Sequence, residues 1–110
     1  MWNVCNKDEL NALPKLYETE SISFADKIIH MHLFINGCDW YIAEYSEEDN
    51  IFFGFAILNS DFDMAEWGYV SLDELMEVKT ELGVEVDRDL FWKIRPAKEV
   101  EDITRCKFWQ

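Results

Sequence analysis

The chain has 110 residues, of which 49% are hydrophobic and 15% aromatic, and its formal net charge is -13 at pH 7. This length fits one domain, residues 1–110, that can bury a core without metal or disulfide help. The apolar content excludes an intrinsically disordered chain despite the high charge.

The cysteines and the N-terminus bear on the cellular compartment. Cys5, Cys38 and Cys106 are far apart and form no C-x-x-C pair, which is typical of reduced thiols rather than of a disulfide framework. The first residues show no basic region followed by an apolar run, and no apolar stretch approaches the roughly 18 residues that span a bilayer. We therefore expect a cytoplasmic protein with no membrane contact.

The N-terminal part predicts one short helix. Asn6 and Glu9 have the spacing of a capping box, in which each side chain accepts from the backbone N–H of the other residue. Pro14 lacks a backbone donor and ends or redirects this helix. Residues 15–26 mix charged and apolar side chains without a period, so we expect an extended connection that lies on the body.

Asn36-Gly37 lies between two apolar runs and predicts a β-hairpin, because both residues tolerate the positive φ angles of a two-residue turn. The turn sets a register that puts four pairs on the core face: Ile35/Cys38, Leu33/Trp40, Met31/Ile42 and Ile29/Glu44. The opposite face then carries Phe34/Asp39, His32/Tyr41, His30/Ala43 and Ile28/Tyr45.

Two further strands follow the hairpin. Residues 51–58 are apolar on both faces, as expected for a central strand, and Gly54 within them predicts a bulge or a close backbone approach. Residues 65–70 alternate between apolar and polar side chains and predict the next strand. Residues 84–92 alternate at first and are a candidate fifth strand.

Ser71 and Glu74 form a second capping box, which opens the main helix. We expect this helix to run to about Leu82 and to end at Gly83. Its inward side chains are Leu72, Leu75 and Met76, with Val78 as a further candidate.

Together these elements predict an α+β fold. Its antiparallel sheet has four to five strands, ordered as a meander from Ile28 to Val70. The main helix, about 71–82, packs on one face, and the short N-terminal helix and the C-terminal segment cover part of the other.

The charge is uneven along the chain. Residues 28–78 contain 11 Asp and Glu and no Lys or Arg. Such a field repels phosphate backbones and attracts basic surfaces. We therefore expect a basic protein partner and no direct nucleic-acid binding through the acidic face. A charge that serves only to keep the protein soluble is the alternative interpretation.

Several runs resemble a known family, among them Ala65-Glu-Trp-Gly-Tyr-Val-Ser-Leu-Asp-Glu-Leu75 and Glu85-Val-Asp-Arg-Asp-Leu-Phe-Trp92. The family is a domain of unknown function found in short acidic proteins of bacterial plasmids, conjugative elements and phages, and the resemblance spans roughly Leu13 to Val100. It implies a mobile-element setting and supplies no site residues. Some members carry a single-stranded DNA nuclease label.

The leading prediction is a small non-catalytic binding protein that engages a basic, nucleic-acid-handling protein and needs no cofactor. It would present carboxylates in place of phosphates, as a nucleic-acid mimic or host-defence antagonist would. The predicted binding residues are acids of the base-free stretch: Glu44, Glu47, Glu48, Asp49, Asp61, Asp63, Glu66, Asp73, Glu74 and Glu77.

The two histidines are a weaker candidate site. His30 and His32 lie two residues apart on one strand face, a spacing that can direct two imidazoles at one metal ion. A third ligand is missing, because Cys38 should point to the opposite face. A structural pair is the favoured interpretation.

The alternative function is a metal-dependent single-stranded DNA nuclease or another hydrolase. Its candidate residues are Asp61, Asp63 and Glu66, or Asp87, Asp89 and Lys93. The first group has no base nearby in sequence, and the second lacks an acid-x-Lys spacing, so solvated charges are favoured. A module that acts as a homodimer through exposed aromatic surface is a third possibility, which leaves monomer and homodimer both open.

The nuclease hypothesis predicts cleavage of labelled single-stranded DNA in the presence of magnesium or manganese. Asp61→Asn or Asp89→Asn should abolish it, because a metal-dependent nuclease loses its ion with the ligating carboxylate. Oligonucleotides that stay intact with the purified protein across common divalent metals would contradict the hypothesis.

Overall fold

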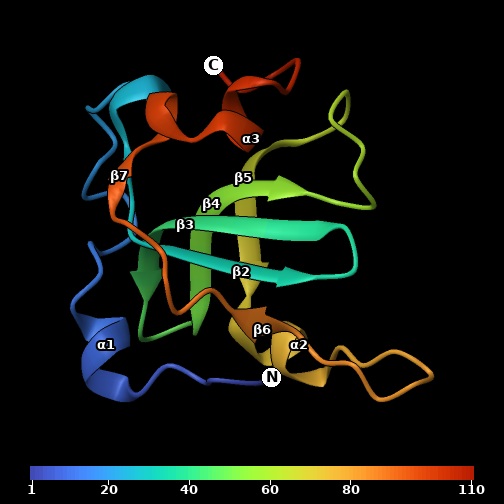
Figure 1. Cartoon of the computed structure of the whole chain (residues 1–110). Helices are drawn as coiled ribbons and strands as arrows, with labels where there is room; N and C mark the ends of the chain where they lie inside the picture. The colour runs from blue at the N-terminus through green and yellow to red at the C-terminus, as the bar shows by residue number, and fades with distance from the viewer.

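The computed structural model describes all 110 residues. The strands are β1 (Ile28–Ile29), β2 (Met31–Ile35), β3 (Cys38–Ser46), β4 (Ile51–Ile57), β5 (Glu66–Ser71), β6 (Asp87–Arg88) and β7 (Arg95–Pro96). The helices are α1 (Lys7–Asn11), α2 (Leu72–Glu77) and α3 (Glu101–Thr104), with short 3-10 helices η1 (Phe24–Asp26) and η2 (Ala97–Glu99). Five strands form one antiparallel sheet in the order β5-β4-β3-β2-β6, and β1 pairs with β7 (Figure 1). The predicted α+β meander is confirmed.

The hairpin of β2 and β3 has the predicted register. Five pairs match, from Ile35 opposite Cys38 to Met31 opposite Ile42. Both turn residues have positive φ, 38° at Asn36 and 83° at Gly37, as a two-residue turn of this type requires. The turn chemistry therefore sets the pairing of the two strands over the length of β2.

The predicted register fails beyond Ile42, because β3 contains a bulge. The pairing with β4 shifts between Ile42, which lies opposite Gly54, and Glu44, which lies opposite Phe53, so Ala43 is an extra residue. A bulge reverses the faces of the residues that follow it. The ladder of β2 with β3 ends at Met31 and Ile42, and β1 pairs with β7, so the predicted pairs Ile29/Glu44, His30/Ala43 and Ile28/Tyr45 are wrong.

Two apolar cores lie on opposite faces of the sheet. The first core joins the sheet to α1 and α2, and its members include Leu10, Leu33, Ile42, Tyr45, Phe52, Leu72 and Leu75. The second core joins the sheet to the C-terminal segment, and its members include Tyr41, Phe55, Ile57, Ala97, Val100 and Ile103. The C-terminal segment covers its face as predicted.

The N-terminal helix covers a different face from the one predicted. Both sides of the predicted capping box of α1 are present, between Asn6 and Glu9. However, Leu10 and Leu13 pack in the first core, on the same face as α2. The N-terminus is held there because the backbone N–H of Trp2 donates to Val86 O at 2.8 Å, next to β6.

The main helix is shorter than predicted. The Ser71 side chain caps it by accepting from the N–H of Glu74, without the reciprocal bond of the predicted capping box. However, α2 ends at Glu77, and Val78 is already extended. The β-branched residues at 78 and 80 favour this extended backbone. Gly83, with φ 83°, lies in a tight turn in which its N–H donates to Thr80 O, rather than at a helix end. Met76 and Val78 are accordingly exposed.

The fifth strand joins the sheet at the β2 edge through β6, which pairs with residues 33 and 34. It is limited to two residues of the candidate stretch. None of the helices is long and apolar enough to cross a membrane.

Gly54 is required by the bulge. A Cβ on this residue would lie 2.1 Å from Tyr41 O, whereas one on its cross-strand neighbour Gly68 would meet nothing within 4 Å. We expect Gly54→Ala to lower the free energy of unfolding by about 3 kcal/mol, because backbone must move to admit the methyl group. Gly68→Ala is the matched control and should change it by less than about 1 kcal/mol. Urea titration of both variants checks this, and equal stabilities would contradict the steric argument.

Candidate functional site

The predicted binding acids lie at two ends of the sheet. Ile51, at the start of β4, pairs with Ser71, and the amide of Asn50 donates to Asp73 Oδ1 at 2.9 Å. The β3–β4 loop therefore lies against the start of α2. We call the exposed acids of these two segments the α2-end acids: Glu47, Glu48, Asp49, Asp73, Glu74 and Glu77.

A second exposed group lies beyond the opposite end of β4. We call its members the loop acids: Asp61, Asp63 and Glu66. Since β4 has seven residues, the two groups are separated by roughly 20 Å along the strand. The structure therefore divides the predicted set into two separate acidic areas.

Glu44 belongs to neither area, because it is only 3% exposed. Its Oε1 accepts from the backbone N–H of Tyr17 at 3.0 Å, and its Oε2 accepts from the N–H of Thr19 at 3.0 Å and from the Thr19 hydroxyl. The bulge in β3 turns this side chain toward the segment that precedes η1. Glu44 thus fixes that segment to the sheet and is not available to a partner.

Lys27 was not identified as a site residue from the sequence, yet it is the other buried charged residue, at 4% exposure. Its Nζ donates to the carbonyl of Thr19 and, at 2.9 Å, to the Thr19 hydroxyl oxygen. Thr19 therefore bridges the buried ammonium and the buried carboxylate of Glu44. No feature of the spacing around Lys27 indicated this role.

The candidate nuclease residues do not come together as a metal site. Asp61 Oδ1 accepts from the backbone N–H groups of Asp63 and Met64, each at 3.2 Å, which is a local turn contact. Asp87 accepts from Asn3 and from the N–H of Arg88. No group of three or more His, Cys, Asp or Glu side chains is arranged to hold a metal ion.

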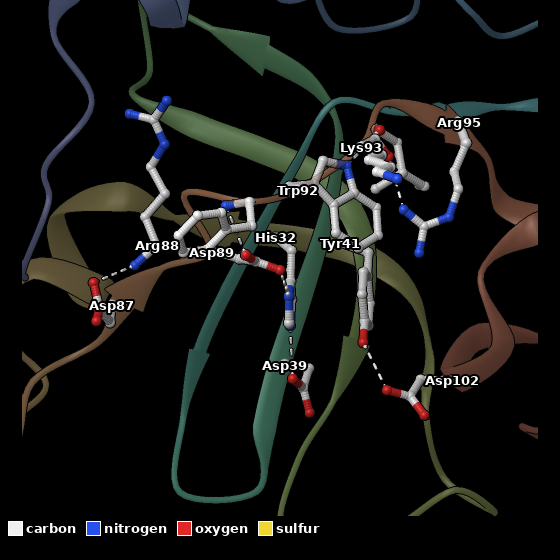
Figure 2. A network of polar contacts seen from close by, with 12 residues as sticks. His32, Asp39, Tyr41, Asp87, Arg88, Asp89, Trp92, Lys93, Arg95 and Asp102 are labelled. Carbon is white, nitrogen blue, oxygen red and sulfur yellow. Dashed lines mark hydrogen bonds and ion pairs between the residues drawn. The ribbon is translucent and has the colours of Figure 1, made fainter.

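His32 lies at the centre of a polar network that joins the hairpin to the chain after β6 (Figure 2). Its Nε2 lies 2.7 Å from Asp39 Oδ1, and its Nδ1 lies 3.4 Å from Asp89 Oδ2. The imidazole stacks on the Tyr41 ring, with centroids 4.5 Å apart and planes at 6°. His30 takes no part in these contacts, so the two histidines do not form a joint site.

Tyr41 extends the network to α3. Its hydroxyl donates to Asp102 Oδ2 at 3.3 Å, and Figure 2 shows the two side chains pointing toward each other. Burial, together with the negative charges of Asp39 and Asp102, raises the pKa of Tyr41 above its usual value, so the hydroxyl stays a donor. A cavity of about 310 Å³ lies beside the ring and is lined also by Trp92 and Arg95.

The chemistry of this network is that of a clamp. A carboxylate lies within hydrogen-bond distance of each ring nitrogen of His32. Both nitrogens are therefore engaged within the protein, and the ring joins β2 to Asp39 on β3 and to Asp89 after β6. The hairpin register already put His32 and Asp39 on one face, but Asp89 and Asp102 are too far along the chain for spacing to bring them here.

The structural role of Glu44 can be tested by Glu44→Gln. The amide keeps one acceptor but points an NH2 group at a backbone N–H, and it removes the buried negative charge that Thr19 links to the buried Lys27. We expect the free energy of unfolding to fall by about 3 kcal/mol in urea titration. Glu48→Gln, at an exposed site, is the control and should change it by less than about 0.5 kcal/mol. If both variants were equally stable, Glu44 would not fix the segment.

The chain was compared with protein families, curated proteins and solved structures. No curated protein matches, and no solved structure matches. The family described as "Protein of unknown function (DUF2958)" matches residues 13–99, most of the chain and nearly the span of the resemblance seen in the sequence. The chain therefore belongs to the DUF2958 family of proteins of unknown function.

Proposed function

We propose that this protein is a non-catalytic binding protein whose exposed carboxylates engage a basic, nucleic-acid-binding surface of another protein. The observation that carries the proposal is the lack of counter-ions around these carboxylates. Among the α2-end acids and the loop acids, only Glu47 forms an ion pair, with Lys7 at 3.4 Å between highly exposed side chains. The remaining charges are free to meet a partner.

Most lysine and arginine side chains of the chain contact groups other than the acids of the proposed surface. Arg88 pairs with Glu9, and Lys98 pairs with Asp26 at 2.8 Å. These contacts lower the pKa of Glu9 and of Asp26 below their usual values, chiefly through the hydrogen bonds from the two bases. Internal pairing therefore neutralises acids outside the proposed surface and leaves the proposed surface uncompensated.

The separation of the two acidic areas supports a partner with an extended basic surface. Charges are screened over about 8 Å at physiological ionic strength, which is shorter than the roughly 20 Å between the areas. Each area should then contribute independently to association. A groove that binds a nucleic-acid backbone offers rows of Lys and Arg over such lengths.

The mobile-element setting implied by the sequence resemblance fits this proposal. An acidic protein of such an element could occupy the nucleic-acid groove of a host enzyme and so protect the element. This setting is part of the proposal, together with a cytoplasmic location.

The proposal predicts salt-sensitive capture of nucleic-acid-binding proteins from a bacterial extract by the immobilised protein. Capture should occur at about 0.1 M salt and be lost at about 1 M, because the Debye length falls from about 10 Å to about 3 Å. A captured protein, once purified, should release a labelled DNA duplex when the acidic protein is added, as measured by fluorescence anisotropy.

Matched charge variants identify the surface. Neutralising Glu47, Glu48 and Asp49 in one variant, and the loop acids in another, should each weaken the displacement of DNA. The control neutralises three exposed acids outside both areas, Glu81, Glu99 and Glu101, and should leave displacement unchanged. If no nucleic-acid-handling protein were captured, or if all three variants displaced DNA alike, the proposed function would be wrong.

A further inference from the structure

β5 is an edge strand with a free side. It pairs only with β4, and β6 forms the other edge of the sheet. Every backbone hydrogen bond of residues 67–70 is made within the ladder with β4, since none of the turn, loop or side-chain bonds involves their N–H or C=O groups. The outer N–H and C=O groups of these residues are therefore open to another strand.

This edge lacks the usual protection against strand pairing. Natural edge strands are blocked by lysine, proline, bulges or inward-pointing charges. Residues 66–71, Glu-Trp-Gly-Tyr-Val-Ser, contain no lysine or proline, and β5 pairs with β4 without a register shift. Gly68 at its centre has open space where a side chain would be. A second backbone can therefore approach closely.

A hollow flanks β5 on each face of the sheet. On the face of the first core, a hollow of about 400 Å³ extends over Gly54 and Gly68 and is walled by Trp40, Ala56 and Val70. On the other face, a hollow of about 420 Å³ is walled by Tyr17, Ile22, Phe24, Phe53 and Tyr69. Successive side chains of a strand point to opposite faces, so a strand added to β5 would place its side chains alternately into both hollows.

The charges around the edge indicate which strand it accepts. The loop acids precede β5, and α2, with Asp73 and Glu74 in its first turn, follows it directly, so acids lie at both ends of the edge. Glu20 lines the second hollow beside the exposed rings of Tyr17 and Tyr69, which can stack on a cationic side chain. Lys27 also lines this hollow, but its ammonium group donates hydrogen bonds to the carbonyl and hydroxyl oxygens of Thr19.

A second copy of this chain fits the edge poorly. In an antiparallel pair of β5 strands, the loop acids of one copy would lie beside the α2-end acids of the other. In a parallel pair, like groups would lie side by side. Both arrangements bring uncompensated carboxylates together, which opposes association.

We infer that the free edge of β5 binds an extended segment of a partner protein as a sixth strand, with apolar side chains in the middle of the segment and lysine or arginine at both ends. This inference rests on the proposed function for the basic character of the partner. It adds the place on the fold where the partner is held and the backbone conformation of the bound segment.

The probe is a synthetic peptide of alternating valine and threonine with two lysines at each end. At about ten times its Kd, it should slow amide hydrogen exchange within β5 by about tenfold and leave the free edge of β6 unaffected. The control peptide has the same sequence with every backbone amide N-methylated, so that it has no N–H group to donate on either edge, and it should cause no protection. Equal effects of both peptides, or protection elsewhere than β5, would overturn the inference.

One variant distinguishes binding at the edge of β5 from binding through the acidic side chains. Gly68→Leu fills the first hollow at a position where the fold has room, and it should weaken peptide binding at least about tenfold, a loss of about 1.4 kcal/mol. Unchanged peptide affinity would overturn the inference, because no segment would then dock at this edge. Wild-type protein that sediments as a dimer while Gly68→Leu is monomeric would also overturn it, because the edge would then bind a second copy of the chain.

The two proposals can fail separately. If Gly68→Leu displaced DNA from a captured protein as well as the wild type did, the strand edge would not be the docking place and the acidic surface would remain the proposed function. If neutralising the acids left DNA displacement unchanged while a lysine-free peptide still protected β5, the edge would bind strands without the proposed function.

Discussion

The arrangement of this molecule depends on the extra residue at position 43 of β3. Without it, Glu44 and Tyr45 would exchange faces, so that a carboxylate would enter the first core and a tyrosine would leave it. The bulge is accommodated because Gly54 on β4 has no side chain to strike the backbone of β3. One inserted residue and one missing side chain thus decide which groups each face of the sheet buries.

The same bulge determines how residues 17–19 are held on the sheet. Glu44 receives hydrogen bonds from two backbone N–H groups and a hydroxyl of a segment with few regular elements of its own. Buried charge is costly unless it is fully bonded, and here Thr19 satisfies the carboxylate and the Lys27 ammonium together. A polar contact, rather than apolar packing, therefore fixes this segment.

Local sequence signals predicted the features that depend on near neighbours. The turn residues predicted the register of the β2–β3 hairpin, and the capping residues Asn6 and Ser71 predicted where α1 and α2 begin. The end of α2 was predicted wrongly, because Gly83 was assigned to a helix end although it serves a tight turn after an extended stretch. The positive φ of a glycine identifies a reversal of the chain and does not say which element it ends.

In the candidate sites too, the sequence predicted contacts between near neighbours and missed those that depend on the tertiary structure. Spacing along one hairpin placed His32 near Asp39, but it could not show that Asp89 would lie beside the second ring nitrogen. Likewise, Glu44 counted as one more acid of a base-free stretch. Gly54 indicated a bulge or a close backbone approach, and both are present, but it did not show that the extra residue lies at position 43 of β3 and so turns Glu44 inward. Exposure of the other acids followed from their positions in loops, at the start of β5 and on the outer side of α2, whereas the burial of this one required the tertiary structure.

The placement of the second core at the end of the chain has a consequence during synthesis. The hairpins from β2 to β5 join neighbouring segments and close short loops, so they can form soon after residue 71 leaves the ribosome. The sheet face that carries Phe55 and Ile57 receives its cover only when Val100 and Ile103 follow. A sheet that formed before these residues emerged would carry one bare apolar face, a surface of the kind that chaperones shield.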